Sequence, residues 1–250
     1  MRTLAGVALA ALLAGTVAAQ PAVNRPLEEK RLSASTLVRE DIFAGFMQND
    51  MKALARGEAS VETLLTQRPE EKAGLLSWRA GATIYRAVLA KEAGRNREYK
   101  TLYGKAIADL DAAAALKSPD GAVPAVSGGV MVLFGDRLKA DQAAAWQRAY
   151  VNYQQIYAGQ GQILDKLPVH HRGEVLGGLV TSAQRTGHTA EMNAGLDRML
   201  VLLKDTPYEA TAKQWKADPA SAGKTNLACK NCHDAGRLEP SLKALSKAPA

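Results

Sequence analysis

The stretch LSWRAGATIYRAVL, residues 76–89, repeats an apolar side chain at every fourth position. The repeating residues are Leu76, Ala80, Ile84 and Val88, with Tyr85 and Leu89 beside them. An α-helix completes one turn in about 3.6 residues, so this spacing gathers the apolar side chains on one face. The stretch therefore predicts an amphipathic helix that buries this face.

The same spacing recurs through most of the chain. Apolar faces are expected at Leu102, Ala106 and Leu110, at Trp146, Tyr150 and Tyr153, and at Met192, Leu196, Met199, Leu200 and Leu203. Helix boundaries are expected at Pro69, Gly94, 118–121, Gly135, Pro168, Gly187 and Pro207. No segment alternates strictly between apolar and polar residues, so the chain is predicted to be all-α, with about eight or nine helices. The three aromatic residues are expected in the core rather than on a binding surface.

The segments 134–149 and 185–200 share a pattern of a glycine turn, a few polar residues and an Ala- or Leu-rich helix. They resemble the tetratricopeptide family, whose repeats are stacked helix hairpins. The resemblance implies a domain of hairpins over residues 33–215, with a concave surface on which another protein docks. Gly94, Gly135 and Gly187 are spaced more widely than the roughly 34 residues of that repeat. An irregular helical bundle therefore stays the alternative fold.

The first 19 residues have the layout of a secretory signal peptide. Arg2 precedes an apolar run at 4–17, and the small residues Ala18 and Ala19 suit a cleavage site. An apolar run of about 14 residues is shorter than the roughly 20 that span a bilayer. The mature protein is therefore expected to be exported to the periplasm without a transmembrane segment, and residues 20–32 are assigned to an N-terminal extension.

The formal net charge is +7, but the basic residues are dispersed along the chain. A nucleic-acid partner needs a concentrated basic patch, which the sequence does not show. The composition therefore argues against nucleic-acid binding. Near the C-terminus, residues 216–226 are polar and contain Pro and Gly, which predicts a linker to a C-terminal segment at 227–250.

That C-terminal segment contains CKNCH, residues 229–233, and its Cys229 and Cys232 are the only cysteines in the chain. A disulfide between them would close a small loop and stabilise little. A redox dithiol usually begins a helix within a βαβ unit, which the pattern does not predict. Zinc needs four ligands, and the remaining histidines, His170, His171 and His188, lie far upstream. The spacing instead favours covalent haem, with two thioether bonds and His233 as the proximal iron ligand.

The motif resembles that of c-type cytochromes, and Arg237, four residues after His233, makes it locally similar to the ending of cytochrome c-prime. The resemblance implies one haem c, attached at Cys229 and Cys232 and ligated by His233. In contrast to the long helix of that family, Gly236 and Pro240 are expected to cut the helix short here. The fold of cytochrome c-prime is therefore not carried over.

The sixth iron ligand decides the function, because an axial Met suits electron transfer whereas an open position suits gas binding or peroxide chemistry. Met192, Met199 and His188 are the candidates considered, with core packing favoured for the methionines and an exposed helix cap for the histidine. The positive charges of Lys230 and Arg237, beside the motif, suit the haem propionates.

The first hypothesis is a monohaem cytochrome, not an enzyme, that carries single electrons between redox partner proteins. A second hypothesis makes the hairpins a scaffold that docks a redox enzyme, with the haem as a relay. A third is a gas sensor or peroxide enzyme with an open haem site.

Overall fold

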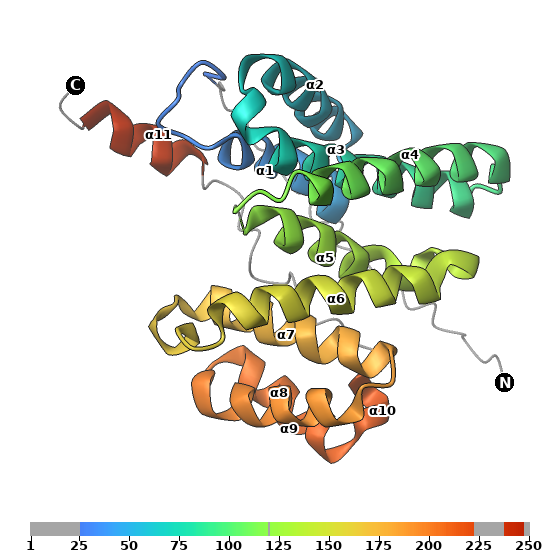
Figure 1. Cartoon of the computed structure of the whole chain (residues 1–250), viewed down its shortest axis with the longest axis vertical. Coiled ribbons are helices and arrows are strands. Elements are labelled where there is room, and N and C mark those ends of the chain that lie inside the picture. Colours follow the sequence, from blue (N-terminus) through green and yellow to red (C-terminus); the bar gives the residue numbers. More distant parts are fainter. Residues whose placement is uncertain (1–25, 120, 223–237, 248–250) are drawn as a thin grey trace, which may run out of the picture.

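The computed structural model describes residues 26–119, 121–222 and 238–247. Every regular element within these ranges is a helix, which confirms the all-α prediction. Four helix pairs follow one another along the chain: α1 (Ala34–Gln48) with α2 (Met51–Gln67), α3 (Lys72–Glu92) with α4 (Asn96–Ala115), α5 (Ala122–Phe134) with α6 (Gln142–Gln160), and α7 (Val169–Arg185) with α8 (Thr189–Leu202). The predicted stack of helix hairpins is visible in Figure 1.

The first helix of each hairpin packs on the hairpin before it. Helix α3 contacts both α1 and α2, α5 contacts α3, and α7 contacts α6 extensively and α5 less. The stack ends in α9 (Pro207–Ala217), which packs on α8, and in the short α10 (Pro219–Ala222). A last helix, α11 (Leu238–Lys247), returns to the other end of the stack and contacts α1 (Figure 1).

Most predicted boundaries coincide with observed ones. Gly94 and Gly187 separate helices with φ angles of 76° and 78°, in the left-handed region that favours glycine. Pro168 directly precedes α7, and Pro207 opens α9. Short 3₁₀ helices fill several corners: η1 (Pro69–Glu71), η2 (Gly135–Arg137), η3 (Lys139–Asp141) and η4 (Leu164–Lys166).

One boundary has no proline or glycine and was not predicted. Asn49 ends α1 with a left-handed φ of 55°, and Asp50 begins α2. The Asp50 carboxylate accepts hydrogen bonds from the backbone N–H groups of Lys52 and Ala53 at 3.0 and 2.9 Å. Asn tolerates the left-handed region and Asp is a favoured N-cap, so the Asn-Asp pair is the signal for this turn.

The C-terminal part contains more helix than the sequence predicts. Of the predicted linker 216–226, residues 216–217 belong to α9 and 219–222 form α10. Pro219 stands in the first turn of α10, where a missing N–H group costs little, so it starts a helix rather than a linker. Pro240 lies within α11 rather than at the end of a described helix, and Gly236 lies outside the described residues.

The core consists of the faces that the periodicity predicts. Ala80, Ile84 and Val88 are fully buried, and so are the aromatic side chains of Trp146, Tyr150 and Tyr153 to within a few per cent. Two glycines bring three helices together around Tyr153. A Cβ atom at Gly178 of α7 would lie 2.0 Å from the Tyr153 ring, and one at Gly128 of α5 would lie 3.1 Å from it. These glycines therefore let α5 and α7 approach α6 closely.

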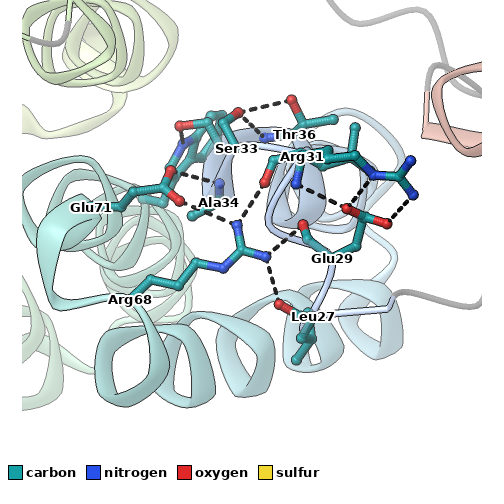
Figure 2. A network of polar contacts seen from close by, with 11 residues as sticks. Leu27, Glu29, Arg31, Ser33, Ala34, Thr36, Arg68 and Glu71 are labelled. Carbon is teal, nitrogen blue, oxygen red and sulfur yellow. Dashed lines mark hydrogen bonds and ion pairs between the residues drawn. The ribbon is translucent and has the colours of Figure 1, made fainter. Parts of the chain in front are cut away.

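The N-terminal extension, where the structure describes it, is held by Arg68. This guanidinium is 3 % exposed and donates hydrogen bonds to the carbonyl oxygens of Leu27, Glu29 and Leu32 at 2.6, 2.8 and 2.6 Å (Figure 2). It also pairs with Glu71 at 3.2 Å. Arg68 thus satisfies three carbonyl groups that precede α1.

Glu71 completes this network at the start of α1. Its second carboxylate oxygen accepts the backbone N–H of Ala34 at 2.7 Å, while Ser33 caps the helix by accepting the N–H of Thr36 at 3.2 Å (Figure 2). The first N–H groups of a helix have no partner within the helix itself. The network therefore fixes where α1 begins relative to the second hairpin.

Replacement of Gly178 by Ala is expected to lower the free energy of unfolding by about 1–3 kcal/mol, because the added methyl group must displace the Tyr153 ring. The matched control is Gly104→Ala. Gly104 is an exposed residue of α4 with no atom near its would-be Cβ, so alanine should raise the stability by up to about 1 kcal/mol. Urea denaturation followed by circular dichroism measures both changes. Equal stabilities of the two variants would contradict the close packing.

Replacement of Arg68 by Gln is expected to cost about 3 kcal/mol or more, since it leaves buried carbonyl groups and Glu71 without their charged donor. Arg31→Gln removes an exposed guanidinium that pairs only locally with Glu29, and it should leave the stability nearly unchanged. Thermal unfolding compares the two variants, and limited proteolysis near residue 30 reports whether the extension is released. Resistance of Arg68→Gln to both tests would contradict this role.

Candidate functional site

The motif residues Cys229, Cys232 and His233 lie outside the described residues, as do Lys230 and Arg237. The structure describes the helices on both sides of them. α10 ends at Ala222 and α11 begins at Leu238, so the candidate site is built from what surrounds these two ends.

Helix α11 is anchored on α1 directly after the motif. The Leu238 side chain is 1 % exposed, and its backbone N–H donates to the Glu40 carboxylate at 3.1 Å. Leu242 and Leu245, at i+4 and i+7, also pack against the core. The chain is therefore fixed to α1 five residues beyond His233.

A cavity of about 290 Å³ opens on the same helix α1. Its size is close to the lower end of the about 300–1,000 Å³ that is usual for ligand pockets. Five helices line it: α1 with Ser35, Arg39 and Phe43; α3 with Trp78; α5 with Ala122, Ala125, Val126, Gly129, Val130 and Leu133, preceded by Gly121; α6 with Tyr153, Ile156 and Gln160; and α7 with His170, His171, Glu174 and Val175.

Two aromatic rings form one wall of the cavity. Phe43 and Trp78 meet edge to face, with ring centroids 5.5 Å apart and an interplanar angle of 87°. The Trp78 indole N–H donates to the Ser35 hydroxyl at 3.0 Å, which fixes the ring against α1. This wall is aromatic, apolar and held in place, so it suits a hydrophobic ligand.

Small residues line the cavity on the side formed by α5. Ala122, Ala125 and Gly129 of α5 line it with little side-chain volume, while Tyr153 and Ile156 of α6 close it with buried side chains. Because Tyr153 is held between Gly128 and Gly178, the packing that builds the core also shapes this cavity.

Polar side chains line the cavity near the start of α7. His170 and His171 are the second and third residues of α7, and their rings lie with centroids 4.1 Å apart. Glu174, one turn later, and Arg39 of α1 complete the polar lining. His170 is half-buried and His171 is exposed. The cavity thus combines apolar walls, two imidazoles, a guanidinium and a carboxylate.

The candidate iron ligands considered from sequence lie elsewhere. Met192 and Met199 are 4 % and 0 % exposed within the core, which agrees with their predicted packing role. His188 stacks on Tyr150 with ring centroids 3.9 Å apart, and its Nδ1 lies 2.7 Å from the Thr186 hydroxyl. None of the three lines the cavity. His188 is the N-cap residue of α8, as predicted, but it is part-buried in this contact rather than exposed.

From the sequence, His170 and His171 were considered only as zinc ligands far upstream of the cysteine motif. The cavity residues Arg39, Phe43 and Trp78 were not identified. The available signal was the pair of imidazoles at 170–171, two residues after Pro168 at a predicted helix start. In the described part of the chain, no group of three His, Cys, Asp or Glu side chains is placed to hold a metal ion. No described helix is long and apolar enough to cross a membrane.

No protein-family model, curated protein or solved structure matches the chain.

The contact of α11 with α1 is expected to depend on the buried Leu238 side chain. Leu238→Asp places a charge in an apolar contact, and a helix of ten residues is too short to be stable once detached. Hydrogen exchange of α11 should therefore rise to the rate of an unfolded peptide, while α3 to α7 keep their protection. Ala244→Asp, on the exposed side of α11, serves as the control and should leave the exchange unchanged. Equal protection of α11 in both variants would show that another contact holds it.

Proposed function

We propose that this chain is an exported c-type cytochrome that carries one covalently attached haem and transfers single electrons between redox partner proteins in the periplasm. The observation that carries the proposal is the single C-x-x-C-H sequence at 229–233. Its placement supports the proposal as well, since α11, anchored on α1, follows the motif by a few residues.

The chemical groups around the cavity are of kinds that contact haem. Haem is planar and apolar over most of its surface, and its two propionates are anionic. Phe43 and Trp78 supply apolar aromatic surface, Arg39 supplies a cation, and the imidazoles of His170 and His171 supply nitrogen donors. A cavity of about 290 Å³ does not enclose so large a group, however, so the proposal rests on the motif and not on this cavity.

The chain's own residues would act in separate ways. The thiols of Cys229 and Cys232 would hold the haem, each by adding across one vinyl group, so that an S–H bond and a C=C π bond would be replaced by one C–S and one C–H bond without an oxidant. His233 would supply a nitrogen ligand to the iron. When bound, the haem iron supplies one-electron redox chemistry, and the surrounding burial and axial ligands tune its potential.

The proposal is tested by expressing the full chain with a haem-attachment system and recording intact mass and a pyridine haemochrome spectrum. The exported protein is expected to carry one haem that survives denaturation. The double variant Cys229→Ser with Cys232→Ser should carry none, because no thiol remains to form the bond. Lys230→Ser changes a spacer position and should keep the haem.

A bare polypeptide mass for the exported wild-type protein would overturn the proposal and return the two cysteines to a dithiol role. A haem that is present but lost on denaturation from every variant would also contradict covalent attachment at Cys229 and Cys232.

A further inference from the structure

We propose that the cavity between α1, α3, α5, α6 and α7 binds a small apolar carboxylate. The anionic group would lie against Arg39 and the start of α7, and the apolar body would lie between α5, α6 and the aromatic wall. This inference goes beyond the proposed function, because it involves neither the haem nor the cysteine motif.

The size of the cavity limits the size of its ligand. An engineered apolar cavity of about 150 Å³ binds benzene. The cavity here measures about 290 Å³, so it has room for roughly twice as many atoms, or about twelve non-hydrogen atoms. A single ring with a short side chain matches this size, whereas a haem does not fit inside.

Most of the lining offers an apolar surface. Phe43 and Trp78 meet edge to face, and the hydrogen bond from the indole N–H to Ser35 holds the Trp78 ring in place. On the other helices, the side chains of Val130 and Ile156 are only 2 % and 7 % exposed. An apolar ligand body that enters the cavity leaves water and contacts these side chains, which provides most of its affinity.

The polar end of the cavity favours an anion. Arg39 is half-buried on α1 and carries a permanent positive charge. His170 and His171 begin α7 and supply ring nitrogens that can donate hydrogen bonds. Helix α7 has no acidic residue in its first turn, and its N-cap Pro168 makes no side-chain capping bond. The positive end of this helix dipole is therefore not offset by the helix's own side chains.

Two features of the lining oppose an anion. Glu174 lies one turn after His170, and Gln160 marks the negative C-terminal end of α6. Against them stand the guanidinium of Arg39, which can bind a carboxylate through two parallel N–H groups, and the two imidazoles. We therefore expect the cavity to prefer a carboxylate over a neutral or a cationic group on the same apolar body.

The test is isothermal titration calorimetry of the exported full chain with three ligands of one carbon skeleton: 4-phenylbutyrate, 4-phenylbutyramide and 4-phenylbutylamine. This skeleton matches the size of the cavity. We expect 4-phenylbutyrate to bind with a dissociation constant of about 1 mM or lower. It should bind about fivefold or more tightly than the neutral amide, because its hydrogen bonds are charge-assisted, and the amine should bind most weakly.

Arg39→Gln tests the polar end of the site. This variant should weaken 4-phenylbutyrate binding about fivefold or more and leave 4-phenylbutyramide binding unchanged. The ratio of the two affinities does not depend on how much of the protein is folded, so it stays informative if the variant is unstable. Arg31→Gln removes an exposed arginine that does not line the cavity, and it should change neither affinity.

Ala125→Leu tests the apolar end. The larger side chain would fill part of the cavity, so binding of the carboxylate and of the amide should both be lost. The matched control is Ala114→Leu on the exposed side of α4, a helix that contributes no residue to the lining. It should bind both ligands as the wild type does, and circular dichroism checks that both variants are folded.

Several results would overturn the inference. The wild type might bind none of the three ligands at millimolar concentration, bind the carboxylate and the amide equally, or bind the amine most tightly. Unchanged binding by a folded Ala125→Leu variant would place the ligand outside this cavity. None of these results bears on the covalent haem, which intact mass reports separately.

Discussion

The contact of the Tyr153 ring with two glycines determines how closely the middle helices of this protein approach one another. A Cβ atom would overlap the ring at Gly178 of α7 and would press tightly on it at Gly128 of α5, so α6 lies nearer to both helices than larger residues would allow. Because Tyr153 also closes the cavity, the spacing of the hairpins and the shape of the candidate site have one cause. A side chain that separated these helices would alter the stability and the site together.

Arginine side chains link the hairpins at their surfaces. Arg86 pairs with Glu58 between α3 and α2, and Arg79 with Asp109 between α3 and α4. Arg185 of α7 reaches Asp136, where burial raises the pKa of the carboxyl but hydrogen bonds from Arg185 and Trp146 outweigh it and lower the net value. Such partly exposed pairs add little energy each, so their main effect is to fix the register of neighbouring helices.

Much of the fold was predictable because its signals are local. The four-residue spacing of Ala80, Ile84 and Val88 and the turns at Gly94 and Gly187 depend only on neighbouring residues. The cavity was not predictable, because its lining comes from five helices that are distant in sequence. The place of His170 and His171 in this lining depends on how α7 packs on α5 and α6, whereas the haem motif is itself a local pattern and stays a prediction of the sequence.

The return of α11 to α1 sets the order in which the molecule folds. Nearly all packing joins helices that are neighbours along the chain, and such local contacts form rapidly. The bond from Leu238 to Glu40 instead closes a loop of 198 residues, which costs more chain entropy than any hairpin. We therefore expect this contact to form after the stack and to open before it, so that the last helix can be released while the hairpins stay folded.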